Sequence, residues 1–458
     1  MAKGRSSYGV DMLNGPIMMP LMRFALPLML SGILQLLFNA ADVIVVGKFA
    51  GDNALAAVGS TGSLTSLIVN LFMGLSIGTN VVAARFYGAQ DYQCMSRTVH
   101  TSMMISIIFG VVLTIIGVAF APTFLEWMGS PEEVIGLASL YLRIYFCGML
   151  AIMIYNFGAA ILRSVGDTKR PLIYLFIAGV VNVVLNLIFV IKFNMSVAGV
   201  ALATLISQVI SAALVVICLI RTEGAIHFDV RKMCIDKKVL AEIIRVGLPA
   251  GLQSTMFAIA NVVIQSAINA FGAVAVAANS AASNLDGFVY TAMNSVSQAT
   301  TSFTSQNYGA RKYDRLWKIF KASMLCVGIV GLVLGVGVWF FGDTLLTMYT
   351  DSADVITAGM VRLTWMCLPY VLCGIMEIIV GALRGIGYSV APMLVSVFGA
   401  CVFRLAWIYT VCRLPVFAET TAGIYMSYPV SWIITEAAHF GIFIYGMRKL
   451  KVRDPLAQ

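Results

Sequence analysis

Long apolar runs constrain this chain more than any other feature of its sequence. Twelve runs of about 20 residues or more follow one another with short polar breaks, centred near positions 33, 70, 110, 148, 181, 208, 257, 290, 330, 370, 402 and 435. About 20 helical residues, rising 1.5 Å each, cross a hydrocarbon layer of about 30 Å. With 60% hydrophobic and 11% charged residues, the chain is an integral membrane protein, and the runs indicate helices rather than a β-barrel.

The basic residues follow membrane topology. The net charge of +9 does not indicate a nucleic-acid partner: if the N-terminus is cytoplasmic, 24 of the 30 Lys and Arg residues fall on the inner side, five fall outside, and Arg404 lies within a helix. This bias predicts a multi-pass protein of the plasma or inner membrane with both termini in the cytoplasm. A cleavable signal is not expected, because the first apolar run is full length.

The second half of the sequence repeats the first at an offset of about 221 residues. Four signatures recur in order: Leu26-Pro27 with Leu248-Pro249, Phe49-Ala50-Gly51 with Phe271-Gly272-Ala273, Tyr87-Gly88-Ala89 with Tyr308-Gly309-Ala310, and Leu162-Arg163-Ser164-Val165-Gly166 with Leu383-Arg384-Gly385-Ile386-Gly387. Each repeat holds six helices, an even number, so both repeats start on the same side of the membrane. We therefore predict an all-α membrane protein of twelve transmembrane helices, in two parallel six-helix bundles related by a pseudo-twofold axis along the membrane normal.

The longest polar segment separates the two repeats. We predict an N-terminal six-helix lobe over 15–220, a cytoplasmic linker over 221–242, a C-terminal six-helix lobe over 243–448 and a cytoplasmic tail over 449–458. Substrate paths in proteins of this kind lie between the repeats.

One carboxylate, Asp42, interrupts the first apolar run. It lies in the outer half of the predicted membrane helix, whose far end is marked by Gly47 and Lys48. An ionisable group at such a depth costs several kcal/mol unless it is paired, hydrated or protonated, and intramembrane acids are usually used for ion or substrate passage. The alternative is an acid that merely reaches the membrane interface.

Cysteine and histidine spacing indicates no metal centre. The nine cysteines are scattered singly, without a C-x-x-C pair, and the three histidines are far apart in the sequence. We expect the cysteines to act as small apolar residues.

The motifs together resemble those of the multidrug and toxic compound extrusion (MATE) transporters of prokaryotes. The resemblance covers residues from about 15 to 448 and is carried by the Leu-Pro pair, N-A-A-D-V-I-V-V-G in the first helix, the two Y-G-A ends, and L-R-S-V-G-D-T-K-R-P with its L-R-G-I-G echo. It implies a central cleft that alternates between the two membrane faces and exports organic cations in exchange for H⁺ or Na⁺. It also implies a monomer that contacts membrane lipids and needs no cofactor other than its coupling ion.

The resemblance also implies an ion-coupling site around Asp42. The family carries an Asn and, four residues later, an Asp on helix 5, where this chain has Asn182 and Asn186. The missing second acid favours H⁺, because one acid alone is the plainer proton carrier, while Na⁺ at Asp42 and Asn182 is the alternative. By similarity we add Thr204 and Asn156, although amides and hydroxyls also bridge membrane helices for about 1 kcal/mol each.

The C-terminal half departs further from the family pattern. Where some members have acids on helices 7 and 10, this chain has Met256, Phe257 and Cys373. Its membrane-embedded charges are expected to be Asp286, Glu377, Arg404 and Glu436, with Arg404 pairing with Glu377 and the other two acids as substrate or proton groups. With Asp42 included, these groups give a formal balance of −3, which favours cationic substrates.

Three other functions were weighed against efflux. A lipid or lipid-linked oligosaccharide flippase shares the architecture, but would need more cationic groups in its cleft to hold phosphates. An intramembrane enzyme is not supported, because the chain has no HExxH, G-x-S-x-G or G-x-x-x-x-G-K-[ST] motif. The sequence does not distinguish a passive channel from an antiporter. Uphill efflux that stops when a proton uncoupler is added would distinguish them.

The bias of basic residues predicts which loops face outward. In a single-cysteine scan, a probe at Ser130 or Ser352 should react with a membrane-impermeant thiol reagent from outside, whereas one at Thr222 should react only after permeabilisation. Outside labelling at Thr222 would contradict the topology of two times six helices.

Overall fold

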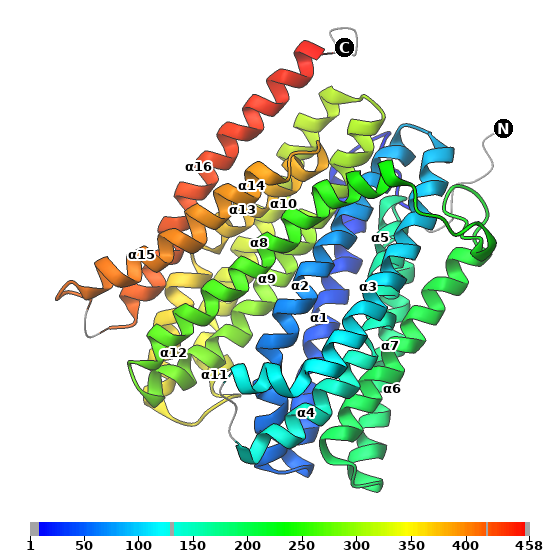
Figure 1. Ribbon diagram of the computed structural model, residues 1–458. Helices are drawn as coiled ribbons and strands as arrows, with labels where there is room; N and C mark the ends of the chain where they lie inside the picture. The colour runs from blue at the N-terminus through cyan, green and yellow to red at the C-terminus, as the bar shows by residue number, and fades with distance from the viewer. Residues whose placement is uncertain (1–8, 129–131, 418–419, 454–458) are drawn as a thin grey trace. The chain divides into compact units, whose positions relative to one another are not determined.

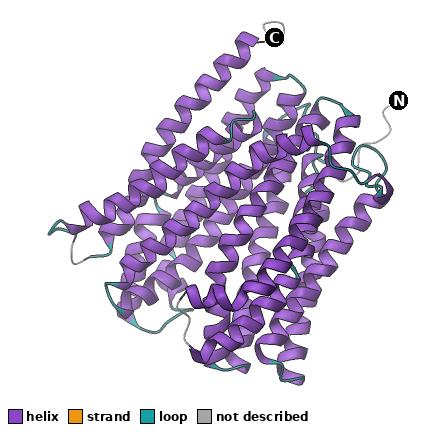
Figure 2. Cartoon of the chain, viewed as in Figure 1, coloured by secondary structure: helices purple, strands orange, loops and turns teal. Residues whose placement is uncertain are grey.

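The computed structural model describes residues 9–128, 132–417 and 420–453, and every regular element in this part of the chain is helical (Figure 2). The first half contains α1 (Met18–Phe49), α2 (Asp52–Gly88), α3 (Tyr92–Trp127), α4 (Glu132–Cys147), α5 (Met149–Ser164), α6 (Lys169–Leu187), the π-helical turn η1 (Ile188–Lys192) and α7 (Ser196–Arg221). The second half contains η2 (Val230–Lys232), α8 (Lys237–Asn269), α9 (Ala273–Gly309), α10 (Tyr313–Phe340), α11 (Gly342–Leu346), α12 (Ala353–Cys367), α13 (Tyr370–Gly385), α14 (Val390–Ser396), the π-helical turn η3 (Val397–Val402), α15 (Phe403–Thr410), η4 (Val411–Arg413) and α16 (Ala422–Arg453).

The predicted fold class is confirmed, with six membrane spans in each half of the described chain. Nine helices in these residues are long and apolar enough to cross a membrane, and two bent pairs raise this number to eleven. The pairs are α4 with α5, bent by 44°, and α12 with α13, bent by 42° (Figure 1). The twelfth span is α9, which is long enough at 37 residues but more polar than the others.

The polarity of α9 is compatible with a membrane because its side chains bond within the protein. The hydroxyls of Ser295, Thr300 and Ser305 each donate to the backbone carbonyl four residues earlier. The helix also packs against α10, α12 and α13, and most of its polar residues from Ser295 to Asn307 are buried, whereas Ser280 and Asn284 are exposed. Among the described spans it is the most polar, although its sequence contains the run centred near 290.

The sequence duplication is repeated in the backbone. The glycines that precede α2 and α9, Gly51 and Gly272, have φ of 87° and 91°. Gly166 and Gly387, in the two L-R-x-x-G motifs, have φ of 95° and 94°, in the left-handed region that glycine adopts without steric cost. The helices α2 and α9 have the same length, 37 residues. A π-helical turn interrupts the fifth span of each half, at its end in the first half (Ile188–Lys192) and near its middle in the second (Val397–Val402).

Contacts divide the chain into two units, and two of the three boundaries between them fall inside helices. The N-terminal unit contains Leu30–Gly251 and the residues up to Val10, and the C-terminal unit contains Asp11–Met29 and the residues from Leu252 onward. The junctions in α1 and α8 therefore each follow a helix proline, Pro27 or Pro249, by two residues. The predicted lobes divide the chain differently, at a linker over 221–242 that here belongs to the N-terminal unit.

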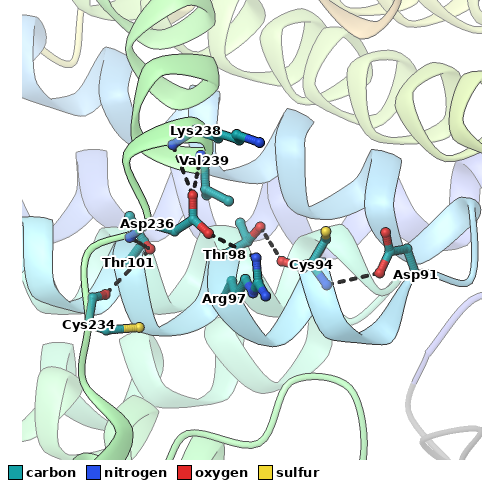
Figure 3. Close-up of polar contacts among 9 residues, drawn as sticks. All are labelled: Asp91, Cys94, Arg97, Thr98, Thr101, Cys234, Asp236, Lys238 and Val239. Atoms are coloured by element: carbon teal, nitrogen blue, oxygen red, sulfur yellow. Dashed lines mark hydrogen bonds and ion pairs between the residues drawn. The ribbon is translucent and has the colours of Figure 1, made fainter.

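Polar bonds fasten this linker to the start of α3 (Figure 3). Asp236 accepts hydrogen bonds from the backbone of Val239 and Lys238, forms an ion pair of 3.2 Å with Arg97, and donates its own backbone N–H to Thr101 Oγ1. The bonds from Val239 and Lys238, with the charge of Arg97, hold the pKa of Asp236 below its ordinary value. Asp236 therefore caps the first turn of α8 as an ionised carboxylate at neutral pH.

Glycines allow α2 and α8 to cross at very close range within the N-terminal unit. Gly74 and Gly78 of α2 face Gly247 and Gly251 of α8, and a methyl group at Gly247 would lie 2.6 Å from the Cα atom of Leu75. Both helices thus carry the small-x-x-x-small spacing that lets membrane helices approach closely. Their contact depends on backbone packing rather than on large side chains.

This crossing predicts opposite effects for two alanine substitutions in α2. Gly78→Ala should destabilise the protein by about 1–3 kcal/mol, because the new methyl group meets the backbone carbonyl of Ile243. Gly59→Ala, with open space around its Cα, should be neutral or stabilising by up to about 1 kcal/mol, since alanine is the better helix former. Thermal midpoints of the purified variants in detergent measure both effects. Equal midpoints would show that the crossing is not tightly packed.

Of the positions chosen to test topology, Ser352 is exposed at the start of α12 and Thr222 directly follows α7. Ser130 lies outside the described residues. The membrane orientation stays a prediction.

Candidate functional site

Four of the predicted ion-coupling residues meet where α1, α6 and α7 converge in the N-terminal unit. Asn186 Nδ2 donates a hydrogen bond to Asp42 Oδ1, and Thr204 Oγ1 donates to Asp42 Oδ2 over 3.4 Å. Asn182 joins the other two: its Nδ2 donates to Thr204 Oγ1 and its Oδ1 accepts from Asn186 Nδ2, each at 3.2 Å. These side chains close a cycle of hydrogen bonds, called the Asp42 ring below.

Helical spacing places the two amides of the ring. Asn182 and Asn186 are four residues apart on α6, so their side chains lie on the same helix face. Both are buried, at 5% and 0% exposure. Two residues after Asn186 the helix changes to the π-helical turn η1, a local widening that is frequent at functional sites.

The partners of Asp42 in the described contacts are neutral. No basic side chain compensates its carboxylate there, and the buried Oδ1 atom of Asn186 has no hydrogen-bond partner. The orientation of an amide is assigned from its hydrogen bonds, and rotating Asn186 would direct this oxygen towards Asp42. Carboxylate, amide and hydroxyl oxygens are the ligands that small hard cations prefer, so the ring fits either a proton on Asp42 or a cation such as Na⁺.

Asn156 is not part of this ring. It lies on α5, and its Nδ2 donates to the carbonyl of Ile152 on the same helix, 2.8 Å away. This bond satisfies the amide within its own helix, so it neither joins the ring nor bridges to another helix. A role of Asn156 in ion coupling stays a prediction.

Asp286, in the C-terminal unit, has a basic partner that the sequence analysis missed. Arg362 of α12 contacts Asp286 Oδ2 with both Nε (2.9 Å) and Nη2 (2.8 Å), and its Nη1 donates to Asn279 Oδ1. Arg362 is only 8% exposed. The predicted charge balance of −3 is therefore wrong, because it leaves out the buried Arg362. The available signal was an arginine within the apolar residues of α12, nine residues after the helix starts.

The predicted pairing of Arg404 with Glu377 is also wrong. Arg404 Nε donates to Ser431 Oγ at 2.8 Å, and its guanidinium lies 4.1 Å from the centre of the Tyr428 ring. Both partners belong to α16, so a hydroxyl and an aromatic face, rather than a carboxylate, compensate the buried charge. The adjacency of helices 10 and 11 in sequence did not bring these two side chains together.

Glu377 lies instead near Arg384, on its own helix α13, and the two side chains interact electrostatically. Arg384 Nη2 donates to Gln253 Oε1 at 2.9 Å, and Gln253 Nε2 donates to Ser396 Oγ at 3.1 Å. Ser396 in turn contacts His439 Nε2, which also donates to the carbonyl of Pro392. This chain of contacts links α8, α13, α14 and α16 inside the C-terminal unit.

Glu436, the remaining predicted acid, is half-buried on α16. Among the described contacts, neither a hydrogen bond nor an ion pair involves its side chain. His439, three residues later on the same helix, bonds to the carbonyl of Pro392 in α14 instead. A role of Glu436 in binding substrate or protons stays a prediction.

Comparison with known proteins assigns the chain and its fold to a class of membrane transporters. The model of the MatE family matches residues 27–188 and 249–410, one segment in each half of the duplication. The two segments together cover more than half of the chain. The protein therefore belongs to the MatE family, the MATE transporters that its motifs resemble.

Relatives and solved structures agree with this assignment. The chain is 26% identical to the probable multidrug resistance protein YoeA of Bacillus subtilis over 94% of both chains, and 21% identical to the multidrug export protein MepA of Staphylococcus aureus over 86% of this chain and 88% of MepA. The crystal structure of MATE in its bent conformation matches with a TM-score of 0.88 at 25% identity over 99% of both chains. A MOP superfamily transporter from Pyrococcus furiosus, described as having a binding pocket of reverse polarity, matches with a TM-score of 0.89 at 25% identity over 98% of this chain and 99% of that chain.

Proposed function

We propose that this protein is a secondary active antiporter that exports lipophilic organic cations in exchange for H⁺ by alternating access, with Asp42 as the coupling acid. One observation carries the proposal: Asp42 is a membrane-embedded carboxylate held only by neutral side chains in the described contacts, whereas Asp286 has Arg362. A carboxylate without a fixed positive partner needs a mobile one, either a proton or a bound cation. The Asp42 ring supplies oxygen atoms for both.

The ring also indicates how protonation could change the site. An ionised Asp42 accepts hydrogen bonds from Asn186 and Thr204, but a protonated carboxyl must donate one. Protonation therefore rearranges the contacts between α1, α6 and α7 and removes the negative charge. Either change can favour release of a cationic substrate on the outer side, where protons are more abundant. A pH gradient contributes about 1.4 kcal/mol per unit, a tenfold bias of a two-state cycle, whereas the membrane potential contributes nothing when one proton is exchanged for one monovalent cation.

Support for drug-like substrates comes from the relatives, because YoeA and MepA are named for multidrug resistance and export. The buried acids no longer supply a large negative excess, since Arg362 neutralises Asp286. The flippase alternative would need free cationic groups for phosphates, but the described contacts commit the guanidinium groups of Arg362 and Arg404 to partners. We further propose that the protein lies in the plasma membrane with both termini in the cytoplasm.

Asp42→Asn should abolish coupling. The amide resembles the protonated carboxyl but cannot exchange a proton, so ethidium export driven by a pH gradient in proteoliposomes should fall at least tenfold, while folding and insertion stay nearly unchanged. The measurement is proton flux coupled to ethidium transport at matched protein levels. Asp351→Asn, which neutralises an exposed acid, is the control and should behave as wild type. Unchanged coupling in Asp42→Asn would place the ion site elsewhere.

Asn186→Asp should add a response to Na⁺. The substitution restores the second acid of the family pattern beside Asp42, and two carboxylates attract a cation more strongly than one does. Export of ethidium under an imposed Na⁺ gradient, without a pH gradient, should rise several-fold over wild type. Asn156→Asp places the same new charge outside the Asp42 ring and should not give this response. Equal Na⁺ responses in both variants would mean that the ring does not form the ion site.

A further inference from the structure

The most connected polar cluster of the C-terminal unit has Arg362 at its centre. The three nitrogens of its guanidinium are all engaged: Nε and Nη2 contact Asp286, and Nη1 contacts Asn279 Oδ1. Asn279 Oδ1 also accepts from the Tyr425 hydroxyl at 3.0 Å, and Asn279 Nδ2 donates to Gln265 Oε1 at 2.6 Å. The guanidinium lies 5.6 Å from the centre of the Tyr425 ring. Four helices, α8, α9, α12 and α16, thus hold one cation and one acid out of water.

In the duplication these four helices correspond to α1, α2, α4 and α7 of the first half. The corresponding positions there hold different residues. At the offset of 221, Arg362 corresponds to Tyr141 and Tyr425 corresponds to Thr204 of the Asp42 ring. Tyr141 belongs to an apolar cluster with Val58, the equivalent of Asn279. In the first half, the acid Asp42 has only neutral partners in the described contacts. In the second half, the acid Asp286 is paired with a cation, Arg362, that is a residue of the same chain and cannot dissociate.

The surroundings of Asp286 offer no other positive group among the described residues. The titratable side chains within electrostatic range of it are Arg362 and Cys367 on α12, Tyr370 and Cys373 on α13, and Tyr425 on α16. Of these only Arg362 is basic. If the guanidinium were removed, Asp286 would be a buried carboxylate with neutral neighbours, the condition in which Asp42 is found.

We infer that the C-terminal unit contains a second cation site, built around Asp286, whose permanent occupant is the guanidinium of Arg362. The ligand class of this site is a proton or a small monovalent cation. Because the arginine cannot leave, the site does not exchange ions during transport, and coupling is confined to Asp42. The inference rests on the proposed function, since it concerns which acids exchange the coupling ion.

The experiment compares the number of ions moved per substrate. The full-length protein is reconstituted in liposomes, and the ethidium concentration ratio at which net ethidium flux stops is measured at zero membrane potential under an imposed H⁺ gradient or an imposed Na⁺ gradient. Wild type should move one coupling ion per ethidium. Arg362→Met should move about two, because Asp286 becomes exchangeable.

Two further variants separate this effect from a structural one. Arg362→Lys keeps a tethered cation and should retain the wild-type ratio. The double variant Arg362→Met with Asp286→Asn removes the acid as well and should also retain that ratio. A folded Arg362→Met with an unchanged ratio under both gradients would overturn the inference, and so would a doubled ratio in the double variant.

Loss of folding is covered by a second measurement. Removing one partner of a buried ion pair is strongly destabilising, so Arg362→Gln, which can still bond Asn279, is purified in parallel. Its thermal midpoint should rise when K⁺ is replaced by Na⁺ or when the pH is lowered, and the midpoint of the double variant should not. If neither single variant folds and the double variant does, Arg362 is a structural ion-pair partner only and the inference fails.

Failure of the proposed function gives a different result. In that case Asp42→Asn keeps its coupling whatever residue is present at position 362. If Asp42→Asn loses coupling while Arg362→Met leaves the ratio unchanged, only the inference about the C-terminal unit is wrong.

Discussion

A carboxylate that is removed from water must be balanced by a positive charge, and the charges of this protein can be understood from that requirement. The two units meet it in different ways. In the C-terminal unit, Arg362 approaches Asp286 to 2.8 Å and the charge is balanced within the fold. In the N-terminal unit, the contacts of Asp42 are an amide and a hydroxyl, which orient the carboxylate without neutralising it. A fixed counter-charge favours a stable structure, whereas a missing one favours exchange with an ion from outside.

The duplication provides the framework on which this difference is built. Equivalent glycines and helix bends give both halves the same backbone plan. Side chains at equivalent positions have nevertheless diverged: Tyr141 corresponds to Arg362, and Asn156 corresponds to Glu377. A common backbone with different polar residues allows one half to bind an exchangeable ion while the other holds its charges in internal pairs and networks.

The same requirement for internal bonding explains the composition of individual helices. A helix that faces protein on most sides can be polar if its side chains find partners, as the hydroxyls of α9 do by bonding to their own backbone. Where helices must approach closely, as α2 and α8 do, glycines replace large side chains. The apolar run centred near 290 predicted α9 from the sequence, although this helix is more polar than the other eleven spans of the described chain.

The sequence by itself determined the membrane class, the twelve spans, the duplication and the family, because apolar length and repeated motifs are local properties of a chain. It also predicted that Asn182 and Asn186 share a helix face, since a helix has a fixed period. Tertiary structure decided which charged residues meet. Arg362 and Asp286 are 76 residues apart, and Arg404 bonds to Ser431 rather than to Glu377. Such pairings depend on how helices pack and rotate against one another, and sequence spacing does not encode that geometry for residues on different helices.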